Sequence, residues 1–230
     1  MGAMIFLYRL ARWLVLAFAL SACSSTPPPD PVATMSWDYA ADAVMLEIIA
    51  SPGLNTDDGQ AHTLLLGIYQ MADAQAFRDL AADPAALAGT MASGKAAPAF
   101  LQFSRYVVTP GQHSWLILDR AQNARSVGIV AGYTRLAAAG AARQFDVPVV
   151  TETSGYLFKT HTARPLPLVV RLNLGTQGVV NAVTLAQGLK PADLVRARQL
   201  EGGGKEIRLD GNGADSLRDP SLPPTARPKN

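Results

Sequence analysis

Residues 44–70 read VMLEIIASPGLNTDDGQAHTLLLGIYQ, and this stretch decides the fold class. Its two ends, residues 44–49 and 62–70, are rich in the branched and aliphatic residues typical of strands. The residues between them, 51–61 (SPGLNTDDGQA), contain one proline, two glycines and three Asn or Asp residues, a composition typical of loops. The stretch therefore predicts a strand, a long polar loop and a second strand.

Later parts of the chain repeat this strand-like pattern. Residues 103–108 lead into residues 109–111 (TPG), and residues 114–119 continue after them. The sequence therefore predicts a hairpin whose Pro-Gly pair occupies positions two and three of a type II turn. The other predicted strands cover residues 127–133, 145–150 and 166–174.

A helical pattern separates the second and third strands. Residues 73–81 place Phe77 and Leu80 on one face, and Asp83-Pro84 supplies an N-cap residue and an N1 proline for a second short helix. Short strands separated by turn signals predict a mainly β protein, an antiparallel β-sandwich with a short helical insertion. Three aromatic residues in strand-like runs are expected to lie in the core: Tyr69, Trp115 and Tyr133.

The first 22 residues have the order of a secretory signal. Arg9 and Arg12 come first, an apolar run follows, and Ser21 and Ala22 are small. The apolar run is shorter than the ~20 residues of a spanning helix. Cys23 is the only cysteine, and Leu-Ser-Ala-Cys resembles the lipobox of bacterial lipoproteins. We expect cleavage between Ala22 and Cys23 and lipidation of Cys23. The alternative is an incidental cysteine after an ordinary cleavage site.

The remaining chain divides by composition. Residues 23–35 hold the lipidated cysteine and a proline-rich tether expected to be extended, residues 36–200 form the sandwich domain, and residues 201–230, rich in Gly, Pro and charge, form a disordered tail. The signal carries two arginines and no acid, so residues 23–230 carry 18 basic and 18 acidic side chains. This even balance, without a Lys/Arg cluster, argues against nucleic-acid binding.

The sequence contains no evident catalytic or metal-binding constellation. His62, His113 and His161 are far apart, and none has a metal-ligand spacing to another His, Cys or acid. There is no Gly-x-Ser-x-Gly elbow and no phosphate-binding glycine loop. Asp57-Asp58 could contact a hard cation, but Ca²⁺ needs about six to eight oxygens and no EF-hand pattern surrounds the pair. We therefore expect no enzyme, no cofactor, no metal site and no small-molecule substrate.

A set of residues in a fixed order resembles a known protein family. The set comprises Leu54-Asn55, Gly59, residues 68–70 (IYQ), Phe77 with Leu80, residues 109–111 (TPG) and residues 127–131 (VGIVA). Their order and spacing are similar to those of the outer-membrane lipoprotein of the type VI secretion system, the TssJ/VasD/SciN-like family, and the lipobox agrees. That family usually carries an Arg-Pro pair between the loop and the second strand, where this chain has Gln60-Ala61-His62. It usually has an Arg just before Ile-Tyr-Gln, where this chain has Gly67, and a Trp-Arg pair near the last third, where this chain has Ala142-Arg143.

The resemblance implies a transthyretin-like β-sandwich that is anchored by lipid to the periplasmic face of the outer membrane. It also implies that the long loop binds the periplasmic domain of a TssM-like inner-membrane protein. Hairpin loops need only about two to five residues, so this loop is long, and its polar composition predicts that little of it is buried. The rival hypothesis is a stand-alone periplasmic lipoprotein whose sandwich binds a small ligand or a peptide. The partner-binding residues expected in the loop are Leu54, Asn55, Thr56, Asp57, Asp58 and Gly59.

Overall fold

A computed structural model describes residues 30–135, 138–156, 159–185 and 205–209. The helices are α2 (Pro31–Thr34), α3 (Gln75–Ala82), α4 (Pro84–Ser93) and α5 (Ala138–Ala141). The strands are β1 (Ala40–Ala50), β2 (Leu64–Met71), β3 (Gln102–Val108), β4 (His113–Arg120), β5 (Ser126–Gly132), β6 (Ala142–Asp146), β7 (Val149–Ser154), β8 (Thr160–Pro165), β9 (Leu168–Leu174), β10 (Val179–Thr184) and β11 (Lys205–Arg208).

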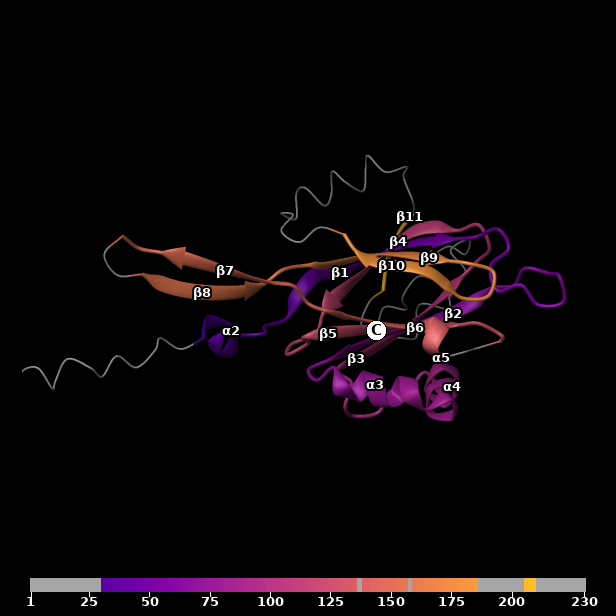
Figure 1. The fold of residues 1–230 in the computed structure, drawn as a ribbon, viewed down its shortest axis with the longest axis horizontal. Helices are drawn as coiled ribbons and strands as arrows, with labels where there is room; N and C mark the ends of the chain where they lie inside the picture. Colours follow the sequence, from indigo (N-terminus) through magenta and orange to yellow (C-terminus); the bar gives the residue numbers. More distant parts are fainter. Residues whose placement is uncertain (1–29, 136–137, 157–158, 186–204, 210–230) are drawn as a thin grey trace, which may run out of the picture.

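The strands form two packed sheets and a separate ribbon (Figure 1). One sheet has five strands in the order β10-β9-β1-β4-β11, the other has four in the order β3-β2-β5-β6, and β7 pairs with β8 alone. The prediction of a mainly β sandwich with a short helical insertion is therefore confirmed. The five-stranded sheet is mixed, because β1 pairs antiparallel with β4 but parallel with β9, and β11 pairs parallel with β4.

The main core lies between the two sheets. Alternate residues of β1 point into it, because side chains on a strand face opposite sides of the sheet in turn. Apolar residues of β2 and β5 meet them from the second sheet, and Tyr133, as predicted, belongs to the same cluster. The central members are Val44, Leu46, Ile48, Leu66, Ile68, Val127, Ile129 and Leu116, all at most 1% exposed.

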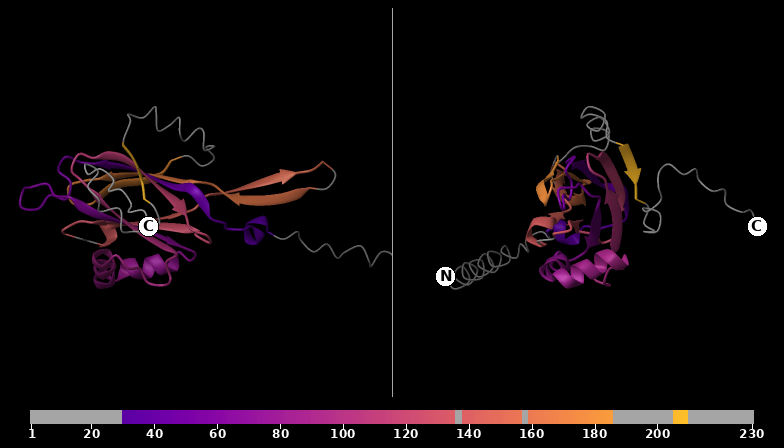
Figure 2. Two further views of the ribbon diagram at one scale, coloured as in Figure 1. Left: turned by 180° about the vertical axis from the view of Figure 1, so that it is seen from behind. Right: turned by 90° about the vertical axis from the view of Figure 1, so that its right-hand side faces the viewer.

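Helices α3 and α4 cover the outer face of the four-stranded sheet (Figure 2). Asp83 caps α4 as predicted, since its Oδ1 accepts from the N–H groups of Ala85 and Ala86 at 3.0 Å. Phe77 of α3 packs directly on β5, where a Cβ added at Gly128 would lie 2.2 Å from its Cδ2. The sheet therefore carries a glycine at the point where the helix comes closest.

The hairpin predicted around residues 109–111 is present. Gly111 has φ 74°, which suits the third position of a type II turn. The strand predicted over residues 145–150 is instead two strands, β6 and β7, because Pro148 interrupts the run and cannot donate a ladder hydrogen bond. Strands β8 and β10 were absent from the prediction, since their Thr- and Asn-containing sequences lack a strong apolar alternation.

Two segments expected to lack regular structure contain short elements. Pro31–Thr34 form one helical turn inside the predicted extended tether, because Pro31 sits where no N–H is required and Asp30 Oδ1 accepts from the Val32 N–H at 2.9 Å. Lys205–Arg208 form β11 inside the predicted disordered tail, and Leu209 beyond it is buried. The prediction of disorder is therefore wrong for residues 205–209, where pairing with β4 supplies the order.

The molecule is elongated, and its two ends differ. Figure 1 shows the loop between β1 and β2 projecting from one end, and the β7–β8 ribbon with α2 at the other. The view from behind in Figure 2 shows the same separation. Strand β1 connects the two ends directly, because it begins after α2 and finishes at the loop.

Candidate functional site

The loop between β1 and β2 ends in a tight turn. Asp57 and Gln60 exchange backbone hydrogen bonds of 2.9 Å, and the two residues between them have φ 47° (Asp58) and φ 77° (Gly59). Positive φ at both central positions is the type I′ arrangement, which favours Asp-Gly. The turn therefore fixes the backbone of an exposed tip formed by Asp58, Gly59 and Gln60.

The base of the same loop is buried. Leu54 is 0% exposed and belongs to the main core, and Asn55 is 6% exposed with φ 48°. The Asn55 Nδ2 donates to the carbonyl of Thr63 at 2.9 Å, and its Oδ1 accepts from the Thr134 N–H at 2.8 Å. The prediction that little of the loop is buried is therefore wrong at its base, where one amide joins both arms of the loop to the segment after β5.

The middle of the loop contacts two neighbouring loops. The Thr56 N–H donates to the Thr176 carbonyl at 2.8 Å, which ties the loop to the turn between β9 and β10. Arg135 Nη2 lies 3.0 Å from Asp57 Oδ1, with 69% of the arginine side chain exposed. An ion pair this exposed adds little stability, and the arginine remains accessible to a binding partner while 30% of the Asp57 side chain is exposed.

Tyr133 holds these neighbouring loops in place from below. Its hydroxyl donates to the Gly178 carbonyl at 2.8 Å, and burial raises the pKa of Tyr133 to about 12. The end of the sandwich is thus a supported surface built from several loops. Of its members, the sequence indicated only the β1–β2 loop. Arg135 and Thr176 carry no local signal, because they join the surface only through the tertiary fold.

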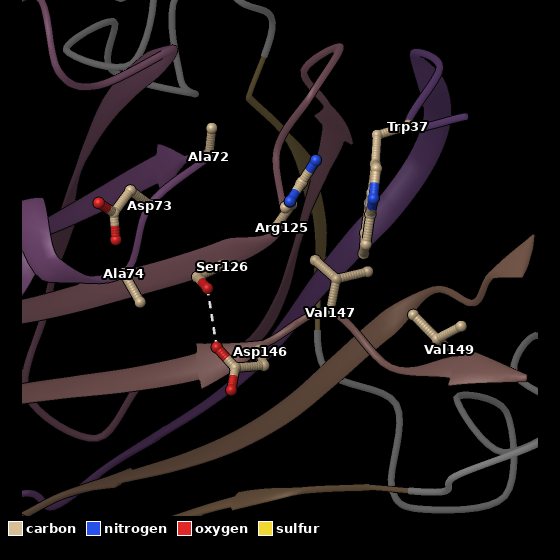
Figure 3. A pocket seen from close by; sticks show the side chains of 9 residues that line it. All are labelled: Trp37, Ala72, Asp73, Ala74, Arg125, Ser126, Asp146, Val147 and Val149. Atoms are coloured by element: carbon tan, nitrogen blue, oxygen red, sulfur yellow. Dashed lines mark hydrogen bonds between the residues drawn. The ribbon is translucent and has the colours of Figure 1, made fainter. Parts of the chain in front are cut away.

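A second candidate site is an open hollow of about 490 Å³ at one end of the four-stranded sheet, where β2 and β6 end and β5 begins (Figure 3). Figure 3 shows the Arg125 side chain beside the Trp37 ring, and the guanidinium carbon lies 5.6 Å from the ring centre. Ser126 Oγ donates to Asp146 Oδ1 at 2.7 Å on the floor of the hollow. Its lining residues are Trp37, Ala72, Asp73, Ala74, Arg125, Ser126, Asp146, Val147 and Val149.

The two carboxylates of this hollow, those of Asp73 and Asp146, already have partners within the chain. Asp73 Oδ1 accepts from the Gln75 N–H at 2.8 Å, and Asp146 is bonded to Ser126. The Trp37 carbonyl accepts from the Asn123 N–H at 2.7 Å. Ligand sites are usually enclosed and offer a few convergent polar groups, and the contacts of Trp37 are better explained as fixing the segment that enters β1.

A buried carboxylate lies on the outer face of the five-stranded sheet. Glu47 is 1% exposed, with the Nε of Arg171 at 2.6 Å and the Nε2 of His113 at 2.9 Å. Trp115 and Met45 pack on the same face, and Trp115 is buried as predicted. Tyr69 is also buried as predicted, against α3 and α4, and its burial raises its pKa. A carboxylate with two basic partners at this depth is a structural group.

The histidines lie on separate elements of the described chain. His62 is exposed in the loop, His113 contacts Glu47, and His161 Nδ1 lies 3.0 Å from Thr153 Oγ1 in the ribbon. Among the residues that the structure describes, no group of three or more His, Cys, Asp or Glu side chains could hold a metal ion. Within the same residues, no helix combines the length and apolar character needed to cross a membrane. The predicted cleavage and lipidation residues, Ala22 and Cys23, lie outside the described residues.

Comparison with known proteins gives one family. Residues 42–173, from β1 to β9, match the family T6SS-SciN, described as type VI secretion lipoprotein, VasD, EvfM, TssJ. No curated protein matches the chain.

Several solved structures are similar to the chain. The T6SS lipoprotein TssJ1 from Pseudomonas aeruginosa is 24% identical, over 65% of this chain and 98% of that one, with a TM-score of 0.46. Serratia marcescens Lip, a membrane-bound component of the type VI secretion system, is 21% identical over 63% and 97%, with a TM-score of 0.46. A chain of the structure described as the T6SS protein TssM C-terminal domain from EAEC is 17% identical over 63% and 98%, with a TM-score of 0.39.

Proposed function

The chain belongs to the type VI secretion lipoprotein family, whose members are structural, non-enzymatic lipoproteins of a secretion membrane complex, and from this membership we propose how it joins that complex. Acylated Cys23, exposed by cleavage after Ala22, anchors the chain to the periplasmic face of the outer membrane. The β1–β2 loop binds the periplasmic domain of a TssM-like inner-membrane protein. The domain thereby fixes the complex to the outer membrane.

The position of the two attachment points carries this proposal. The loop lies at one end of the sandwich, and α2, the first described element after Cys23 in the chain, lies at the other. An extended chain spans at most about 3.3–3.6 Å per residue, so the start of α2 stays within about 30 Å of the acylated residue. The lipid and the loop therefore act on opposite ends of one domain, as a connecting subunit requires.

The strand between these ends is well suited to carry tension. Strand β1 runs from the α2 end to the loop, and it is hydrogen-bonded to β4 on one side and to β9 on the other. A pull along β1 loads these ladder hydrogen bonds together rather than one after another. The Arg120 Nη2 bond to the Asp38 carbonyl, 2.6 Å long, adds a further link just before β1.

The tip of the loop is the part that we expect to bind. Asp58, Gly59 and Gln60 are exposed, whereas Leu54 and Asn55 hold the loop in place from below. Of the six residues expected to contact the partner, we therefore assign direct contact to Asp58 and Gly59, and we add the exposed neighbour Gln60. A few residues at the centre of an interface usually carry most of its binding energy.

A double substitution in the tip tests this proposal. Asp58→Asn with Gln60→Ala removes a charge and an amide, while asparagine still tolerates the positive φ of position 58. We expect the affinity for the purified periplasmic domain of the TssM-like partner to fall at least ~10-fold, which corresponds to about 1.4 kcal/mol. Titration calorimetry of the mature chain in detergent measures this change.

The matched control makes the same chemical changes on another surface. Gln75→Ala with Asp79→Asn alters an exposed pair on α3, far from the loop in the fold, and should leave the affinity unchanged. Both double variants should unfold at the wild-type temperature, since surface changes usually alter stability by less than about 0.5 kcal/mol. Equal affinities for the tip variant and wild type would move the interface away from this loop.

A further inference from the structure

Strand β10 is the outermost strand of the five-stranded sheet, and no described strand pairs with its free side. Its sequence, VVNAVT, contains no charged residue and no proline. Every other described strand with a free side carries at least one charged residue, namely β3, β6, β7, β8 and β11. Proteins usually protect a sheet edge with charge or proline, because an open row of N–H and C=O groups pairs readily with another chain. The β10 edge lacks both of these protections.

The pairing with β9 identifies the backbone groups of β10 that are open. The Leu185 N–H donates to the Val169 carbonyl at 2.8 Å, and the register between the two strands is regular from residue 181 onward. In an antiparallel pair, alternate residues direct both of their backbone groups toward the neighbouring strand. Counted back from Leu185, every second residue therefore bonds to β9. The residues between them, Ala182 and Thr184, direct their N–H and C=O groups to the free side.

Two apolar side chains accompany these open backbone groups. Val180 is 75% exposed, at the point where the register of β10 shifts, and Val183 is 39% exposed. The start of the strand is closed, because Arg143 Nη2 on β6 donates to the Val179 carbonyl at 3.5 Å. The open part of the edge therefore comprises residues 180–184. An added strand would form backbone hydrogen bonds there and cover apolar surface at the same time.

Strand β10 starts at the end of the sandwich that carries the β1–β2 loop. The Thr176 carbonyl, in the turn just before β10, accepts from the Thr56 N–H of that loop at 2.8 Å. The Tyr133 hydroxyl supports the same turn through the Gly178 carbonyl. Figure 1 shows the turn between β9 and β10 at the loop end of the molecule, with β10 leading away from it. A protein bound at the loop tip therefore lies next to the near end of the β10 edge.

We propose that the β10 edge is a second part of the same interface, where an extended segment of the TssM-like periplasmic domain adds a strand to the five-stranded sheet. This inference rests on the proposed function. In this mode of recognition, hydrogen bonds to the backbone of Ala182 and Thr184 supply affinity, and apolar side chains at alternate positions of the added strand pack on Val180 and Val183. The partner is then held both at the loop tip and along the sheet.

A proline at position 184 tests this inference. Thr184→Pro removes an N–H that points away from β9, so the ladder to β9 stays intact. Thr184→Val is the matched control, since valine also lacks the hydroxyl but keeps the N–H. We expect the affinity for the purified periplasmic domain to fall ~5-fold or more for the proline variant and to change less than ~2-fold for the valine variant. Titration calorimetry of the mature chain in detergent measures both.

A second measurement uses the wild-type chain. The amides of Ala182 and Thr184 should exchange with deuterium at least ~10-fold more slowly when the periplasmic domain is bound, because hydrogen bonding protects an amide from exchange. Mass spectrometry with fragmentation of the peptides resolves these two amides. This measurement decides the question if the proline variant fails to fold.

The outcomes separate this inference from the assignment of the loop tip. If neither amide gains protection and Thr184→Pro binds as wild type, while the tip variant with Asp58→Asn and Gln60→Ala binds weakly, strand addition is overturned and the loop assignment stands. If the wild-type chain does not bind the periplasmic domain, both are overturned. If the two amides become protected at high concentration of the chain alone and the partner adds nothing, the edge joins two copies of the chain, and the inference is overturned.

Discussion

Replacing Asn55 should loosen the base of the β1–β2 loop and lower the stability of the domain by a measurable amount. Asn55→Ala removes the bonds to the Thr63 carbonyl and the Thr134 N–H, 2.9 and 2.8 Å long. Thr63 and Thr134 are exposed residues, so water can replace the lost partner, and each bond contributes about 0.5–1.5 kcal/mol net. Alanine at φ 48° adds about 1–2 kcal/mol of backbone strain.

The sum is a destabilisation of about 2–5 kcal/mol. For a domain of this size each kcal/mol lowers Tm by about 2–4 °C, so Asn55→Ala should unfold roughly 4–20 °C below wild type. Asn55→Gly provides the control, because glycine loses the same two hydrogen bonds but adopts positive φ without strain. The order of stability should therefore be wild type, then Asn55→Gly, then Asn55→Ala.

Urea denaturation of the mature chain, followed by tryptophan fluorescence, measures these differences if the slope m stays constant. Trp37 and Trp115 lie in separate parts of the fold and report the same transition when unfolding is cooperative. Two results would refute the reasoning. If both variants unfold within about 0.5 kcal/mol of wild type, the amide does not support the loop. If the alanine variant is at least as stable as the glycine variant, residue 55 does not have positive φ.

Three other predictions concern the anchor, the histidines and acid stability. Cys23→Ser should abolish uptake of a radiolabelled fatty acid and prevent signal cleavage, since a hydroxyl cannot replace the thiolate in thioether formation. Continued labelling of the serine variant would contradict the lipoprotein assignment. Each of the three histidines changed to glutamine should leave secretion within a few-fold of wild type, and a folded, correctly located variant without secretion would argue for a chemical role. The Tyr39 hydroxyl donates to Asp119 and lowers the pKa of that carboxyl, with help from the Asp42 N–H. The stability gained from the ionised carboxyl is present at neutral pH and is lost as pH falls below about 4. Tyr39→Phe should therefore lose less stability between neutral pH and acid than wild type does. An equal loss in the two proteins, measured by denaturation at several pH values, would contradict this.

Local patterns in the sequence were enough to predict most of the central elements. The strands on either side of residues 51–61 and the hairpin around Gly111 follow from apolar runs and turn residues that lie next to each other. The start of α4 likewise follows from Asp83-Pro84, where the cap and its recipients are neighbours in the chain. These features depend on contacts within a few residues, so the sequence determines them.

The tertiary structure decided what depends on residues far apart in the chain. Strand β9 pairs parallel with β1 across more than a hundred residues, and β11 is a strand because β4 offers an open edge. The β1–β2 loop has a polar composition, yet its Leu54 enters the core and its Asn55 bonds to Thr134. Burial is set by the elements that pack against a residue, and those elements come together only when the sheets form. The same reason explains why the β7–β8 ribbon, whose sequence gave no strong strand signal, stands beside α2 at the end of the molecule where the tether begins.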